Sequence, residues 1–495
     1  MSGSDGEAIL DRPVGEIGAA LRAGETSAHE LAQASIDRIA ALDGPLGSFL
    51  ATTPELALGA ADAADKAIKS GTAGPLAGIP LAIKDVLCLR GAECTAGSRI
   101  LAGFIPPYTA TTVQRALDAG MVPVGKTNCD EFAMGSSGEN SGYRPVANPW
   151  DITRVPGGSS AGSTVAVAAG MTPAALGSDT GGSIRQPAAL TGVVGLKPTY
   201  GRTSRYGLIA FASSLDHVGT FTHTVADAAI LLEAIAGHDP LDSTSSPRPV
   251  EDLGRGLAEG VAGLKLGVPR EYFVEGMEPG VEAAVRAAMG QLEKEGAELV
   301  EISLPHTGYG VAIYYILAPA EASSNLARMD GVRFGHSAPD APSVVAQYMQ
   351  ARGEGFGKEV KRRIMIGTYA LSSGYYDAYY VKAQKARTLV KQDFDTAFES
   401  VDAIVCATSP TVAFPIGAKT QDPLAMYLND VLTIPADLAG IPAISVPCGF
   451  SDGLPVGLQV MGPSWREDVV LRVAAAYESI NDWGARRPAP VVGAA

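Results

Sequence analysis

Residues 157–201 constrain the fold most strongly, because very small residues and regularly spaced apolar residues occur there together. Glycine, serine, alanine and threonine dominate this stretch, and such a composition often indicates a flexible linker. Eight apolar side chains interrupt it: Val165, Val167, Leu176, Ile184, Leu190, Val193, Val194 and Leu196. Their regular recurrence argues against a linker and predicts a closely packed backbone with turns that need positive φ.

The pattern on both sides of this stretch predicts an α/β fold. Short apolar runs alternate with glycine-rich turns and with helical stretches such as 112–119. The first runs are 79–86, 121–124 and 165–169, and later strands are expected at 264–268, 297–302, 403–406, 444–447 and 456–461. Because strands recur towards both ends of the chain, one interleaved domain is expected rather than several domains in series.

This single domain, 1–495, is expected to have four consecutive parts. Residues 1–70 form an N-terminal helical segment, in which Ser27 and Glu30 match a capping box. Residues 71–235 form the core. Residues 236–420 form a mostly helical insertion that contains the substrate pocket and begins with an exposed loop at 238–262. Residues 421–495 return to the core with strands and a closing helix.

Composition excludes several classes of protein. Hydrophobic residues make up 46% of the chain and charged residues 18%, which suits a well-buried core. The net charge of −15 argues against autonomous binding of nucleic acid, because neutralising phosphates needs clustered lysine and arginine. The five cysteines form no CxxC pair, so free thiols in the cytoplasm are expected, and neither disulfides nor a metal site. No apolar run is long enough to span a membrane, and the N-terminus does not resemble a signal peptide.

Residues 120–127 match the phosphate-loop pattern GxxxxGK[ST]. A phosphate cradle needs a loop after a strand, with backbone N–H groups turned inward. Here the four residues between the glycines are themselves strand-like, the helix precedes them, and Pro123 has no N–H. The pattern is therefore interpreted as a strand, and affinity for ATP or GTP would restore the alternative.

Residues 158–162 match a second pattern, the nucleophile elbow GxSxG, with Ser160 as the nucleophile. Such a hydrolase also needs an acid and a later histidine. The candidates are His217, His223, His238, His306 and His336. None lies in a visibly specialised loop, and the stretch carries more glycine and serine than an elbow needs. The elbow stays open as an alternative.

A third set of motifs uses the same stretch differently. Lys84 ends an apolar strand, Ser159 lies in Gly-Gly-Ser-Ser-Ala-Gly-Ser, and Ser183 lies in Gly-Ser-Asp-Thr-Gly-Gly-Ser-Ile-Arg. In this order and at these spacings the motifs resemble the amidase signature family. The resemblance implies an α/β fold with a central mixed β-sheet flanked by helices, and a catalytic set of Lys84, Ser159 beside a cis peptide, and the nucleophile Ser183. Ala161 stands where the family usually has glycine.

These residue types can cleave an amide together. Serine is a poor nucleophile until a base takes its proton, and a lysine with the ordinary pKa of about 10.4 cannot be that base. Burial can lower the pKa of a lysine by up to about 3–5 units. A neutral Lys84 would then accept the proton of Ser159, which accepts that of Ser183. The backbone N–H groups expected to stabilise the oxyanion are those of Thr180, Gly181, Gly182 and Ser183.

Three further stretches, 126–135, 318–328 and 367–380, resemble the glutamine-hydrolysing branch of the amidase signature family. This resemblance implies hydrolysis of glutamine through an acyl-enzyme, and ammonia that a tunnel delivers to a B subunit for amidation of Glu-tRNA(Gln) or Asp-tRNA(Asn). It also implies a C subunit, tRNA held through the B subunit, and ATP and Mg used only by the partner. No cofactor is expected in this chain.

Free glutamine carries an α-carboxylate and an α-ammonium, so a selective pocket needs one cation and one anion. The resemblance implies Arg363 and Asp430 for these roles. The alternatives are a solvated helix face for Arg363, with Lys358, Lys361 and Arg362 nearby, and a helix cap for Asp430. The alternative function is a stand-alone amidase that acts on another small amide.

Overall fold

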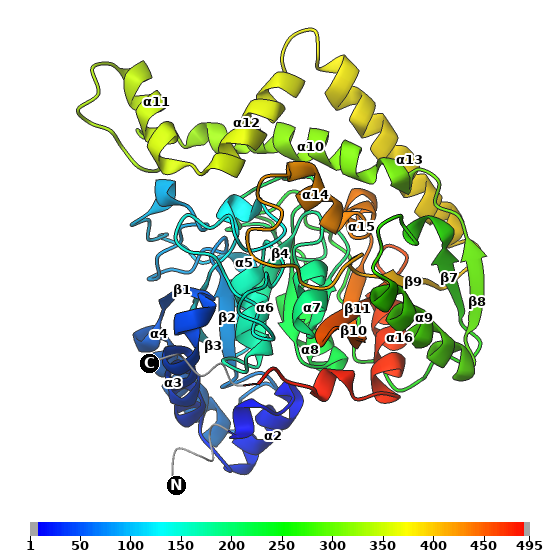
Figure 1. Ribbon diagram of the computed structural model, residues 1–495. Coiled ribbons are helices and arrows are strands. Elements are labelled where there is room, and N and C mark those ends of the chain that lie inside the picture. The colour runs from blue at the N-terminus through cyan, green and yellow to red at the C-terminus, as the bar shows by residue number, and fades with distance from the viewer. Residues whose placement is uncertain (1–7, 490–495) are drawn as a thin grey trace.

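A mixed sheet of 11 strands runs through the computed structural model, which describes residues 8–489 (Figure 1). The strand order is β1-β3-β2-β4-β6-β5-β10-β11-β9-β7-β8. The strands are β1 (Phe49–Thr52), β2 (Pro80–Lys84), β3 (Val122–Thr127), β4 (Ala174–Asp179), β5 (Val194–Lys197), β6 (His217–Thr222), β7 (Lys265–Pro269), β8 (Glu298–Ile302), β9 (Ala403–Ala407), β10 (Ala443–Ser451) and β11 (Leu454–Met461). β2 runs parallel to β3 and β4, and β7 runs parallel to β8 and β9, whereas the other pairs are antiparallel. The predicted α/β fold with a mixed sheet is confirmed.

Helices flank this sheet and also form a layer across one of its ends. The helices are α2 (Val14–Ala23), α3 (Ala28–Leu46), α4 (Pro54–Lys69), α5 (Thr111–Asp118), α6 (Ala161–Ala168), α7 (Arg185–Thr191), α8 (Val225–Ile235), α9 (Pro279–Lys294), α10 (Gly310–Asn325), α11 (Val344–Gly355), α12 (Lys358–Ala370), α13 (Lys382–Ala397), α14 (Pro423–Tyr427), α15 (Ile434–Ala439) and α16 (Glu467–Ser479). The layer consists of α10 to α13, at the top of Figure 1, and α14 and α15 lie between it and the sheet. No helix within residues 8–489 has the length and apolar character that crossing a membrane requires.

The structure confirms some local predictions and corrects others. The capping box at the start of α3 is present, since Ser27 and Glu30 each accept the backbone N–H of the other. The apolar run 165–169 lies mostly in helix α6 and not in a strand. Because α6 is buried on all sides, its apolar residues follow no one-sided period, and a short buried helix then looks like a buried strand.

A segment expected to be helical contributes one strand to the sheet, and the strands predicted within 236–420 are confirmed. β1 lies within the segment predicted to be helical and pairs antiparallel with β3. β7, β8 and β9 lie within 236–420 and form one edge of the sheet. The loop 238–262 has no helix or strand, but it is not uniformly exposed, because the side chains of Asp239, Asp242 and Ser245 are buried.

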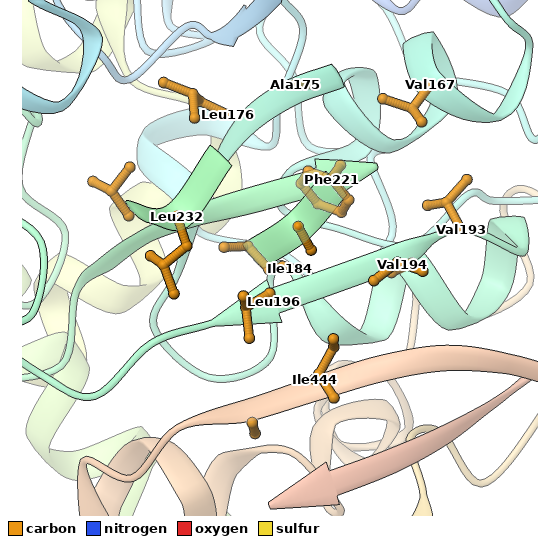
Figure 2. Close-up of a cluster of buried hydrophobic side chains, with 14 of the residues drawn as sticks. Val167, Ala175, Leu176, Ile184, Val193, Val194, Leu196, Phe221, Leu232 and Ile444 are labelled. Atoms are coloured by element: carbon orange, nitrogen blue, oxygen red, sulfur yellow. The ribbon is translucent and has the colours of Figure 1, made fainter. Parts of the chain in front are cut away.

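The small residues of 157–201 lie in the tightly packed centre of the protein, as expected. Every residue from 157 to 199 except Ala169 is buried. A Cβ atom added to Gly162 would lie 2.2 Å from the backbone oxygen of Ser48, so only glycine fits there. Figure 2 shows apolar side chains from β4, β5, β6 and α8 meeting in this region, with Phe221, Leu196 and Leu232 among them. The strands and helix α6 can therefore pack closely enough for the ends of these elements to lie next to one another.

Candidate active site

The strand order places Lys84 at the site. β2 and β4 are parallel neighbours, so their carboxyl ends reach the same edge of the sheet. Lys84 is the last residue of β2, and Ser178 lies at the end of β4. Lys84 Nζ lies 2.8 Å from Ser159 Oγ, 2.8 Å from Ser160 Oγ and 2.9 Å from Ser178 Oγ. The lysine is fully buried among hydroxyl groups.

This environment prepares Lys84 to act as a base. Burial lowers the pKa of Lys84 to about 8, although the negative charge of Asp130 favours the ammonium. A neutral amine has two N–H donors and one lone pair. It can therefore donate to two of the surrounding oxygens and accept a proton from the third.

Ser160 does not have the contacts of a nucleophile. Its hydroxyl donates to the backbone oxygen of Ser178 over 3.0 Å, and its Oγ also lies beside Lys84 Nζ. It is fully buried. An elbow would need a histidine against this serine, but the hydrogen bonds of Ser160 Oγ go to Lys84 and Ser178. Because the Ser160 hydroxyl already donates to the Ser178 oxygen, Ser159 is the better placed of the two to pass its proton to Lys84.

Ser183 lies beside this pair, two residues before the start of α7. The backbone N–H of Ser160 donates to the backbone oxygen of Ser183 over 3.3 Å, which joins the two serine segments. The peptide bond between Gly158 and Ser159 is cis. Ser183 is 7% exposed, whereas Lys84 and Ser159 are 0% exposed. Of the three, Ser183 is therefore the residue that a substrate can reach.

The loop that carries Ser183 is held between two side chains from the helical layer and the C-terminal part. A Cβ on Gly181 would lie 2.7 Å from the ring of Tyr314, and a Cβ on Gly182 would lie 2.2 Å from Thr433 Oγ1. Gly182 also has a φ of 134°, which side chains other than glycine rarely allow. The glycines thus let the loop pass between Tyr314 and Thr433.

The four backbone N–H groups expected at the oxyanion are not equivalent. Gly182 N–H donates to Asp179 Oδ1 over 2.6 Å, so it is already used, in contrast to the prediction. Thr180 is fixed by its hydroxyl, which donates to Asp216 Oδ1 over 2.8 Å. Within residues 8–489, the N–H groups of Thr180, Gly181 and Ser183 have no protein acceptor. These three are the better candidates for stabilising an oxyanion.

A buried ion-pair network stabilises the loop that carries Ser183. Arg185 contacts Asp179 at 3.1 Å and Asp437 at 2.5 Å, and all three side chains are fully buried. Burial alone would raise the pKa of the Asp179 carboxyl, but the Arg185 guanidinium lowers it well below its ordinary value. Removing one partner would leave a buried charge uncompensated, at a cost of about 3–5 kcal/mol. The network therefore fixes both ends of the segment 179–185.

Arg363 is buried, so the alternative of a solvated helix face is wrong. It is 2% exposed, and its Nε donates to Glu359 Oε1 over 2.8 Å. The guanidinium carbon lies 5.0 Å from the ring centre of Tyr315 and 5.4 Å from that of Tyr427. Only one guanidinium nitrogen is bonded to Glu359, which leaves this planar cation suited to bind a carboxylate.

Asp430 is a buried carboxyl group that complements the buried cation Arg363. It is 6% exposed, and its Oδ2 accepts a hydrogen bond from Ser136 Oγ. Among the residues that the structure describes, its Oδ1 has no hydrogen-bond partner. A buried carboxylate oxygen without a partner is costly, and burial accordingly raises the pKa of Asp430 to about 7. An ammonium group placed against Oδ1 would offset that cost.

A cavity of about 260 Å³ reaches Arg363 from the surface. Its lining carries Lys358, Arg362 and Lys419 as well as Glu139 and Glu359. Asp430, which does not line this cavity, is connected to the serine cluster by hydrogen bonds: Ser136 contacts Asp430, and the backbone oxygen of Ser136 accepts from Gln186 Nε2 over 3.0 Å. Gln186 Oε1 in turn accepts the N–H of Gly158 over 3.0 Å.

The phosphate-loop alternative is excluded by the position of Lys126. Residues 122–127 form the buried strand β3, and Lys126 pairs with Asp85 at 3.0 Å and donates to the Leu87 oxygen over 2.8 Å. Ala161, the departure from the family pattern, is accommodated in the first turn of α6. A Cβ on Gly138 would lie 2.6 Å from the Ala161 methyl, so the facing glycine makes room for it.

Fold and site together define an amidohydrolase, and the chain belongs to the amidase family, whose model matches residues 30–471. It is 62% identical to the A subunit of glutamyl-tRNA(Gln) amidotransferase from Chloroflexus aggregans over 470 residues, 95% of this chain and 96% of the relative. The crystal structure of the corresponding protein from Thermotoga maritima is 45% identical, with a TM-score of 0.81 over 98% of this chain and 99% of that one. A peptide amidase from Stenotrophomonas maltophilia is 35% identical, with a TM-score of 0.82 over 97% and 98% of the two chains.

Proposed function

We propose that the chain is the glutaminase subunit of a tRNA-dependent amidotransferase. It hydrolyses glutamine to glutamate and ammonia, and the ammonia amidates Glu-tRNA(Gln) or Asp-tRNA(Asn). The observation that carries this proposal is a buried cation, Arg363, whose charge acts on the buried carboxyl of Asp430. One oxygen of that carboxyl has no partner within residues 8–489, and Asp430 is linked to the serine cluster by hydrogen bonds. Relatives named as the A subunit of glutamyl-tRNA(Gln) amidotransferase support the proposal over nearly the whole chain.

The reaction uses the relay that the family resemblance implies, and the contact of Lys84 with Ser159 supports its first link. Neutral Lys84 accepts the proton of Ser159, Ser159 accepts that of Ser183, and Ser183 Oγ attacks the side-chain amide carbon of glutamine. The N–H groups of Thr180, Gly181 and Ser183 stabilise the oxyanion. The relay returns a proton to the leaving nitrogen, so ammonia departs and a glutamyl ester remains on Ser183. Water then attacks the ester, loses its proton to the same relay, and releases glutamate.

The rest of the reaction belongs to partners in this proposal. A B subunit receives the ammonia through a tunnel, holds the tRNA and uses ATP and Mg, and a C subunit completes the assembly in the cytoplasm. The net charge of −15 agrees with a chain that leaves the tRNA to a partner.

The proposal is tested by purifying the chain alone and together with its genomic B and C partners. A heterotrimer that hydrolyses glutamine and amidates Glu-tRNA(Gln) or Asp-tRNA(Asn) is expected. A chain that purifies without partners and hydrolyses small aliphatic or aryl amides, but not glutamine, would instead support the stand-alone amidase. The similarity to a peptide amidase makes that outcome the relevant alternative.

Replacing Asp430 by alanine is expected to lower kcat/KM for glutamine by about 100-fold or more, because the buried ammonium of the substrate loses its counter-charge. Hydrolysis of a small neutral amide, which has no α-ammonium, should change by less than about threefold. Steady-state kinetics with both substrates measure the difference. Asp395→Ala, on the exposed face of α13, is the matched control. Equal losses with both substrates would contradict the role of Asp430.

A further inference from the structure

Thr433, which no sequence motif indicated, joins the substrate region to the nucleophile loop. It directly precedes α15 and is fully buried. Its Oγ1 lies 2.8 Å from the backbone oxygen of Gly181 and 3.1 Å from that of Asp430. A threonine hydroxyl has a single proton. These two carbonyls, one on each side of the site, therefore compete for it.

Thr433 also contacts residues before and after Ser183. A Cβ on Gly182 would lie 2.2 Å from Thr433 Oγ1, so the loop backbone packs directly against this side chain. The backbone oxygen of Thr433 accepts from Arg185 Nη1 over 3.0 Å. Thr433 thus contacts the chain on both sides of Ser183, while its own N–H donates to the Asp430 oxygen over 3.1 Å.

We propose that Thr433 is a positioning residue that couples binding of the substrate α-ammonium at Asp430 to the placement of Ser183. This inference rests on the proposed function. In this proposal the ammonium group pairs with the Asp430 carboxylate and also donates to the backbone oxygen of Asp430, which leaves the Thr433 proton for the Gly181 carbonyl. The loop is then held where Ser183 faces the amide. Misplacing a nucleophile by about 1 Å can cost about 100-fold in rate.

The test compares glutamine with glutaramate, which keeps the carboxylate and the amide but has no α-ammonium. Thr433→Val replaces the hydroxyl by a methyl group and so removes the proton that Thr433 donates. For glutamine it is expected to lower kcat about 10- to 100-fold, with KM changed less than about threefold. For glutaramate the loss should be at least about fivefold smaller. Thr433→Ser, which keeps the hydroxyl, should retain most of the activity and the substrate preference.

Thr220→Val is the matched control, since Thr220 is buried in β6 and its hydroxyl has no partner within the described residues. Equal losses of Thr433→Val with both substrates would overturn the proposal, and so would a Thr433→Ser variant as impaired as Thr433→Val. If the valine variant does not fold, Thr433→Ala is measured with the same two substrates. Wild-type protein without glutaminase activity would overturn the proposed function instead, before any variant is compared.

Discussion

Replacing Ser183 by alanine is expected to lower kcat for amide hydrolysis by about 10⁴-fold or more, whereas Ser160→Ala should keep most of the activity. Ser183 supplies the oxygen that forms the acyl-enzyme, and no neighbouring hydroxyl can replace it. Ser160 hydrogen-bonds to the Ser178 carbonyl and contributes only one of the oxygens around Lys84 Nζ. Steady-state rates with glutamine and with a small neutral amide measure both effects.

The two variants also control for each other, because each removes one buried hydroxyl from the same cluster. Their thermal unfolding midpoints should be similar, so a difference in rate reports chemistry rather than folding. Mass spectrometry should find a glutamyl adduct on the protein with Ser160→Ala and none with Ser183→Ala. A Ser160→Ala variant as inactive as Ser183→Ala would restore the nucleophile elbow.

Much of the fold followed from local patterns. Alternating apolar runs and turns predicted β2, β3 and the strands from β7 onwards, and the capping box predicted the start of α3, because these signals depend on residues near one another. β1, β4, β5, β6 and the helical state of α6 were not predicted. β1 exists because it pairs with β3 more than 70 residues away, and α6 is too short and too buried to show a helical period.

The site could be predicted only in part, for a related reason. Lys84, Ser159 and Ser183 stand in recognisable motifs, and the spacing of those motifs pointed to them. Ser136 and Thr433 belong to no recognisable motif. Their importance comes from contacts with residues roughly 250–300 positions away: Ser136 with Asp430, and Thr433 with Gly181. No periodicity or short motif records such contacts.

Arg363 illustrates the same limit. Its neighbours on α12 include Lys358, Lys361 and Arg362, and a helix segment with four basic residues is usually exposed. What buries Arg363 is a set of aromatic rings from distant segments, including Tyr315 of α10 and Tyr427 of α14. The sequence contains these tyrosines, but only the fold shows that they surround one cation.

Replacing Lys84 by methionine is expected to abolish hydrolysis, with a fall in kcat of about 10⁴-fold or more, because the relay then has no base. The variant should fold, since burial disfavours the ammonium of Lys84 and methionine carries no charge. Lys84→Arg should be equally inactive, because a guanidinium stays protonated in proteins and cannot accept the proton of Ser159.

The pH dependence of the wild-type enzyme tests the same residue without a substitution. Burial lowers the pKa of Lys84 to about 8, and only the neutral amine accepts a proton, so kcat/KM should rise as the pH increases through about 8 and then level off. Lys197 is also buried with a pKa lowered to about 8, but it contacts the Pro198 and Ile441 oxygens rather than a serine. If Lys84→Arg were active and its kcat/KM still rose with pH through about 8, the titrating group would be another residue, and Lys84 would not be the base. A rise in the wild type together with inactive Lys84 variants is the result that the geometry requires.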